Sequence, residues 1–138
     1  MIAAVALVPS PPFLLPEYAG RTDPDPVLRS ACVEVVESVA AQVDRLVVIC
    51  GSDPDRRHSG RSVGARVATE LLPREADGVH EVPWDASVEA CRSAGESLVV
   101  GEPRDLRLGL VVVADGCATR TEKAPGHLDR RSLTVDAA

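Results

Sequence analysis

Residues 108–126 read LGLVVVADGCATRTEKAPG, and this stretch decides the fold that the rest of the chain must fit. It begins with a continuous apolar run and changes at Asp115 into a polar loop. A run of Leu, Val and Ala of this kind is typical of a strand buried on both faces of a parallel sheet. Ligands of such sheets bind outside the carboxyl ends of the strands. The loop therefore supplies the candidate catalytic residues: Asp115, Cys117, Glu122 and Lys123, the chain's only lysine.

Two more apolar runs of strand length, residues 2–8 and residues 46–50, predict two further buried strands. Between them, residues 25–44 place apolar side chains at intervals of three and four, which predicts an amphipathic helix with Asp25 as its N-cap. A second helical pattern covers residues 63–72.

The chain then changes to weaker signals. Residues 79–84 alternate enough to predict an edge strand that Pro83 ends. A third helix is expected after it, with Asp85 or Ser87 as the cap and Gly95 near its end. A last helix is expected to start at Leu133.

This alternation of strands and helices predicts an α/β fold, and more specifically a three-layer α/β/α sandwich with a mostly parallel or mixed central sheet. A length of 138 residues fits one domain. Because the last helix would begin only a few residues before residue 138, we expect residues 1–138 to be a single domain that is incomplete at its C-terminus.

Composition excludes several classes of protein. A formal charge of -6 and an aromatic content of 2% argue against nucleic-acid binding, which needs a basic surface and often stacking side chains. No apolar run approaches the roughly 20 residues of a membrane helix. Prolines interrupt the apolar N-terminus, which also lacks a basic start, so a secretory signal is not expected. The four cysteines are far apart and match no zinc pattern. We expect a cytoplasmic protein.

The loops after the three buried strands should meet in one crevice, because parallel strands end at the same edge. Ser10, Ser52 and Asp115 would lie there. The loop at residues 51–62, GSDPDRRHSGRS, combines arginines with the start of a helix, a favourable site for a small carboxylate or phosphate. An equally weighted alternative is that these arginines pair with the aspartates of the same loop. The ligand-binding candidates are Ser10, Ser52, Arg56, Arg57, His58 and Arg61.

Three stretches resemble the B subunits of the class III extradiol ring-cleavage dioxygenases and their Memo-like relatives. They are AVALVPSPPFLLPE (4–17), LVVICGSDPD (46–55) and VVVADGCATRTEKAPGHLD (111–129), which follow in order along nearly the whole chain. The resemblance implies an α/β/α sandwich with a mixed sheet. For active members it also implies a non-haem Fe(II) that opens catechol rings with O2.

The chain departs from that family at its functional positions. Ser10 and Ser52 occupy the places of the two metal-binding histidines, and Ala118 occupies that of the acid/base histidine. The resemblance places the carboxylate ligand in a later segment, absent from this sequence. A neutral serine hydroxyl is a poor substitute for imidazole. We therefore expect no metal, no Fe(II) cofactor and no ring cleavage.

Three hypotheses follow for function. The first is an inactive dioxygenase-like domain whose cleft binds a small anionic ligand. The second is an active oxidoreductase with a site rebuilt around Asp115, Cys117, His58 or His127. The third is a structural partner subunit or homo-oligomer, because a shortened domain would leave an apolar face uncovered.

Overall fold

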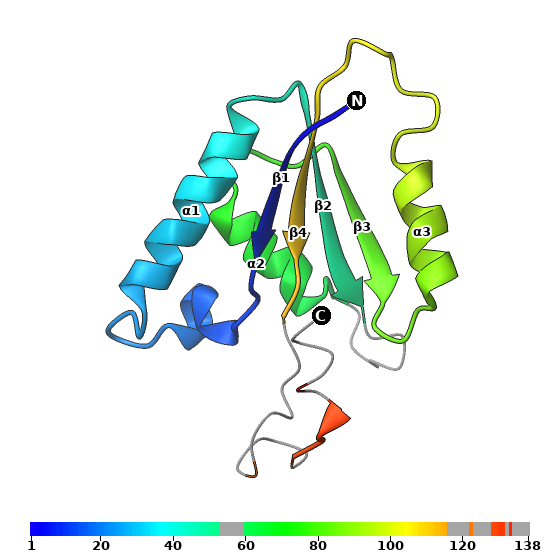
Figure 1. The fold of residues 1–138 in the computed structure, drawn as a ribbon. Coiled ribbons are helices and arrows are strands. Elements are labelled where there is room, and N and C mark those ends of the chain that lie inside the picture. The colour runs from blue at the N-terminus through cyan, green and yellow to red at the C-terminus, as the bar shows by residue number, and fades with distance from the viewer. Residues whose placement is uncertain (53–59, 116–121, 123–127, 132, 134–138) are drawn as a thin grey trace.

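The computed structural model describes residues 1–52, 60–115, 122, 128–131 and 133. Its centre is a four-stranded sheet (Figure 1). The strands are β1 (Ile2–Val8), β2 (Arg45–Ser52), β3 (Gly78–Pro83) and β4 (Leu108–Val113). Their order across the sheet is β1-β4-β2-β3, and all three pairings are parallel. The α/β class and the predominantly parallel sheet are therefore confirmed.

Strand β4 lies between β1 and β2, which confirms the interior position that its unbroken apolar sequence predicted. Leu110 is in register with Val5 on one side and Val47 on the other. Side chains of β4 are buried on both faces, with Leu108 at 1% and Val111 at 0% exposure. The strand therefore carries its polar loop out of the middle of the sheet.

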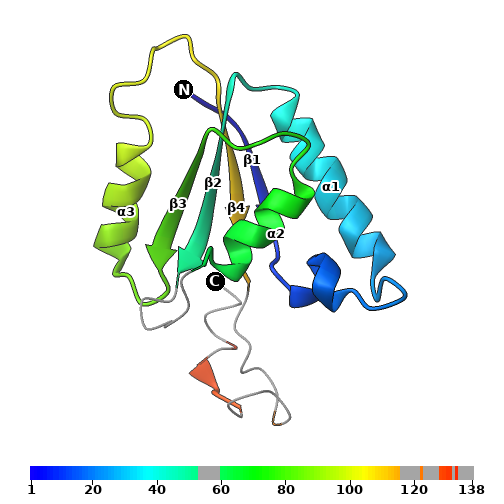
Figure 2. The same ribbon diagram turned by 180° about the vertical axis from the view of Figure 1, so that it is seen from behind.

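One face of the sheet is covered by α1 (Pro26–Ala40) and α2 (Val63–Leu71). Helix α2 lies behind the sheet in Figure 1 and in front of the sheet in Figure 2, which is the view from the other side. Asp25 caps α1 as expected, since its side chain accepts a hydrogen bond of 2.9 Å from the Leu28 amide. The helix ends before residue 44. Asp44, just before β2, binds both the backbone and the guanidinium of Arg107, just before β4. These bonds hold the start of β2 beside the start of β4.

Close packing of this face depends on Gly109 of β4. A Cβ atom there would lie 2.7 and 3.0 Å from the two Cγ atoms of Val43 and 3.1 Å from Cγ1 of Val39. Real Cβ atoms are essentially never found below 3.0 Å. The missing side chain thus lets the C-terminal end of α1 rest directly on the central strand.

The opposite face is covered less completely. Helix α3 (Val88–Ser97) lies beside β3, and its C-cap Leu98 packs with Val47, Leu108 and Leu110. Ser87, one of the two caps considered, accepts a 3.2 Å hydrogen bond from the Ala90 amide. Gly95 does not end the helix, which continues for two more residues. A complete third layer stays a prediction.

Strand β1 differs from expectation, because it is a buried strand only on the face of α1. Its Ala6 and Val8 are 1% exposed, whereas Val5 is 53% and Leu7 is 69% exposed on the other face. The physical reason is its place at the edge of the sheet, on the side remote from α3. Continuous apolar sequence predicted the strand but could not reveal that one face is uncovered.

Beyond β1 the chain follows two short 3-10 turns, Pro12–Leu14 and Pro16–Tyr18. Leu14 and Leu15 are fully buried there, and Arg29 of α1 donates to the carbonyls of Phe13 and Leu14 at 2.9 and 3.0 Å. None of the helices in the described part of the chain is both long and apolar enough to cross a bilayer. The helix expected from Leu133 lies outside the described residues, apart from Leu133 itself.

Candidate functional site

A cleft of about 750 Å³ lies at the carboxyl ends of the strands, where the sequence predicted a crevice. Every strand contributes to it. Ser10 follows β1, Ser52 ends β2, Trp84 follows β3 and Asp115 follows β4, and the first residues of α2 close one side. The volume lies in the range of about 300–1,000 Å³ that is usual for small-molecule sites. The expected meeting of Ser10, Ser52 and Asp115 in one crevice is thus observed.

Among the described residues that line this cleft, Asp115 carries the charge, and Ser10 fixes its orientation. The Ser10 amide donates to Oδ1 of Asp115 at 2.7 Å, and the Ser10 hydroxyl donates to Oδ2. Backbone pairing continues beside it, since the Ala114 amide donates to the Val8 carbonyl at 3.0 Å. An ionised carboxylate offers about four acceptor positions. Two bonds from Ser10 therefore leave acceptor capacity that can face a ligand.

The start of α2 forms the second wall. Ser62 caps the helix by accepting from the Ala65 amide at 3.2 Å, and its own amide donates to Glu81 at 3.1 Å. Its hydroxyl also lies 3.5 Å from Sγ of Cys50. Burial raises the pKa of the Cys50 thiol, which lowers its reactivity as a nucleophile.

Close approach of α2 to β2 rests on Gly64. A Cβ atom at this position would lie 2.9 Å from Cβ of Cys50. Gly64 also lines the cleft, so the same contact that seats α2 on the sheet brings its first turn to the ligand side.

Trp84 is a candidate site residue that the sequence analysis did not include. It is the chain's only tryptophan, it is 71% exposed, and it lines the cleft. Its amide donates to the Ser52 carbonyl at 2.9 Å, which ties it to the end of β2. A signal is present in the sequence, because Trp84 directly follows Pro83 at the end of an expected strand. This signal predicts that Trp84 lies in the cleft only when the edge strand β3 is included among the strands that end there.

Arg61 does not line this cleft. Its guanidinium lies on the other side of α2, where Nη1 is 3.5 Å from Oγ1 of Thr69. Arg61 instead lines a second cavity, together with Thr69 of α2 and Val79 of β3. Glu122 is exposed and is not one of the cleft-lining residues. The other candidates lie outside the described residues: Arg56, Arg57, His58, Cys117, Lys123 and His127.

The positions that resemble metal-ligand positions do not suit Fe(II). Both are neutral hydroxyls, and the Ser10 hydroxyl is bonded to Asp115. Serine oxygen is a weak ligand beside the imidazoles that iron sites of this type use. Within the described ranges, no three His, Cys, Asp or Glu side chains cluster in a way that could hold a metal ion. The expectation that the protein binds no iron remains a prediction.

Comparison with known proteins adds no relative: no family model, curated protein or solved structure matches the chain.

Proposed function

We propose that this protein is a dioxygenase-like domain without ring-cleavage activity, whose cleft binds a small aromatic diol. The observation that carries the proposal is the Asp115 carboxylate, held by Ser10 in a cleft that Trp84 also lines. Two neighbouring phenolic hydroxyls could donate to this carboxylate, and an indole can stack against an aromatic ring. The resemblance to ring-cleavage dioxygenases supports the same class of ligand.

A small anion was the first expectation for this cleft, and the geometry of the described residues now favours a hydrogen-bond donor instead. The charged side chain that lines the cleft is the carboxylate of Asp115. A phosphate or carboxylate close to it would be repelled. Arg61, one of the three arginines expected to bind the anion, points elsewhere, and Arg56 and Arg57 lie outside the described residues. Hydroxyl donors need no such compensation.

Trp84 provides the assay, because it is the only indole in the chain and lines the cleft. Catechol should quench its fluorescence saturably, and inorganic phosphate at equal ionic strength should not. Asp115→Ala should weaken catechol binding about tenfold or more, the loss expected for a charge-assisted hydrogen-bonding group. Asp105→Ala is the matched control, because Asp105 is exposed in the turn before β4, at the other end of the sheet.

Two results would overturn the proposal. One is catechol affinity that is the same in Asp115→Ala and Asp105→Ala. The other is saturable quenching by phosphate that strengthens in Asp115→Ala, which would restore the anion hypothesis because removal of a negative charge favours anions.

The absence of ring cleavage is a separate part of the proposal. Protein purified after growth with added iron should hold no near-equimolar Fe, Mn or Zn and should not convert catechol. Equimolar iron that is lost on substitution of Asp115, His58 or His127 would instead support the rebuilt enzyme.

A second candidate function, that of a partner subunit or homo-oligomer, is favoured by the uncovered face of β1. Val5 and Leu7 point away from α1 and are exposed, and β1 is also an edge strand. A parallel sheet normally has both faces covered, and an apolar edge strand is a template for another strand. The occupant that we propose is a second copy of the chain, because two uncharged strands of identical sequence can pair without opposing charges.

Sedimentation over a concentration series tests this pairing. Wild-type protein should form dimers, and Leu7→Glu should shift them to monomers. Val27→Glu is the control, because Val27 is 78% exposed on α1 and away from β1. A monomer at all concentrations, or equal effects of both substitutions, would contradict the partner-subunit hypothesis.

A further inference from the structure

A second cavity lies between α2 and β3, on the face of the sheet that α1 and α2 cover. Its volume is about 400 Å³. The floor is apolar, with Val48 and Ala65 at 1% exposure and Val79 at 43%. Val79 is in register with Val48 on the neighbouring strand. We call this cavity the α2–β3 crevice; of these three side chains Val79, on the edge strand β3, presents the exposed apolar surface.

Two arginines stand on the rim of the crevice, and their surroundings differ. Arg74 is paired with Asp77, with Nη1 3.1 Å from Oδ2. Arg61 has no carboxylate partner among the described residues, and its contact is the 3.5 Å approach to the Thr69 hydroxyl. That hydroxyl already donates to the Ala65 carbonyl at 2.9 Å. The guanidinium of Arg61 thus keeps most of its donors for another acceptor.

The position of Arg61 is fixed by the elements around it. Ser62 begins α2 and is bound through its amide to Glu81 of β3, so the residue before the cap is held between the helix and the edge strand. Glu75 also lies on the rim, and the Arg61 guanidinium reaches Thr69 in the last turn of α2. A ligand's negative charge is best placed at this guanidinium, because the other arginine of the rim, Arg74, is already paired with Asp77.

We propose that the α2–β3 crevice binds a small amphipathic monocarboxylate, such as a free medium-chain fatty acid. Its carboxylate would accept two parallel hydrogen bonds from the Arg61 guanidinium, a geometry that arginine and carboxylate share. Its alkyl chain would cover Val79 and the apolar floor. Pockets of this type combine apolar walls with a few placed polar groups. The site is separate from the Asp115 cleft and does not depend on the function proposed for it.

Calorimetric titration with octanoate tests the proposal, with octanol and sulfate as probes of the two halves of the ligand. Octanoate should bind saturably at one site, and each of the other two at least about tenfold more weakly, because each lacks one half of the recognition. Arg61→Gln should raise the octanoate dissociation constant about tenfold or more. The dissociation constant of Arg61→Lys should lie between those of the wild type and Arg61→Gln, because lysine keeps the charge but not the paired donors.

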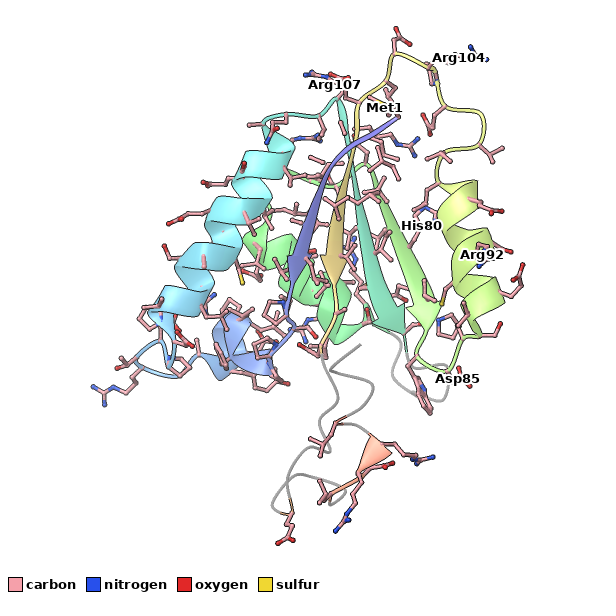
Figure 3. All side chains as sticks on the ribbon, in the orientation of Figure 1. Met1, His80, Asp85, Arg92, Arg104 and Arg107 are labelled. Carbon is pink, nitrogen blue, oxygen red and sulfur yellow. The ribbon has the colours of Figure 1, made fainter. Side chains whose placement is uncertain are left out.

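Arg104→Gln is the matched control, since Arg104 is exposed in the turn before β4, near Met1 and Arg107 (Figure 3), and does not line the crevice. It should bind octanoate like the wild type, and so should Asp115→Ala. Val79→Asp should abolish binding by placing a negative charge on the floor. Equal binding of octanol and octanoate, equal binding of sulfate and octanoate, or equal affinities of Arg61→Gln and Arg104→Gln would each overturn the proposal. Circular dichroism of every variant establishes that the comparison is between folded proteins.

Discussion

Replacing Gly109 by alanine tests how closely α1 packs on the central strand. The new Cβ atom would lie 2.7 and 3.0 Å from the two Cγ atoms of Val43. Val43 is 8% exposed and β-branched, so its side chain has few rotamers to choose from. Strand β4 cannot move away either, because β1 and β2 hold it on both sides.

The magnitude follows from two opposing effects. Overpacking in a core costs about 1–3 kcal/mol. Reduced freedom of the unfolded chain returns about 0.4–1 kcal/mol when glycine becomes alanine. The steric effect wins, and we expect a net loss of about 1.5 kcal/mol in the free energy of unfolding. For a chain of this size that lowers the Tm by roughly 6 °C.

Urea unfolding of four proteins measures the effect: the wild type, Gly109→Ala, Val43→Ala and the double variant. Val43→Ala alone should cost about 1.5 kcal/mol for two lost methyl groups. The loss of unfolding free energy in the double variant should be smaller than the sum of the two single losses by at least about 1 kcal/mol, because removing the Val43 methyl groups removes the clash.

Gly95→Ala is the control of opposite sign. A Cβ atom at Gly95 in α3 meets nothing within 4 Å. This substitution should stabilise the protein by about 0.5–1 kcal/mol, the helix-propensity difference between the two residues. Equal effects of Gly95→Ala and Gly109→Ala, or additive effects of Gly109→Ala and Val43→Ala, would refute the packing argument.

Three other measurements test single side-chain interactions. The Arg107 guanidinium and amide lower the pKa of Asp44 from 3.8 to about 2, so the pair stabilises the fold above about pH 4 and this contribution is lost as the pH falls toward 2. NMR titration of Arg107→Gln should show the pKa of Asp44 rising toward 3.8. Burial raises the pKa of the Cys32 and Cys50 thiols, so peptide mapping after brief alkylation should find exposed Cys91 modified well before either. Arg29→Ala removes the donors to the Phe13 and Leu14 carbonyls and should cost about 2 kcal/mol, whereas Arg66→Ala, which breaks a half-exposed pair with Glu17, should cost less than about 1 kcal/mol in the same urea assay.

Much of the fold could be predicted from local sequence because its signals are local. The unbroken apolar run of β4 indicated a central strand, and the three-and-four spacing after Asp25 indicated α1. Strand order could not be predicted in the same way. Pairing of β1 with β4, more than 100 residues apart, is a long-range contact for which the local sequence carries no signal.

The candidate site shows the same division. Ser10, Ser52 and Asp115 could be predicted to meet because parallel strands share a carboxyl edge. The direction of the Arg61 side chain could not, since its guanidinium approaches the Thr69 hydroxyl of α2, a contact for which the sequence carries no signal. Trp84 was predictable by the edge rule itself, once β3 is counted with the other strands.

The central claim is that the cleft at the carboxyl edge binds an aromatic diol through Asp115. Amide and indole NMR shifts during a catechol titration test it most directly, because they locate the ligand without any assumption about its site. We expect saturable shifts at Ser10, Ser52, Asp115 and the Trp84 indole, and their loss in Asp115→Ala. Shifts confined to the α2–β3 crevice, or the same shifts in wild type and Asp115→Ala, would contradict it.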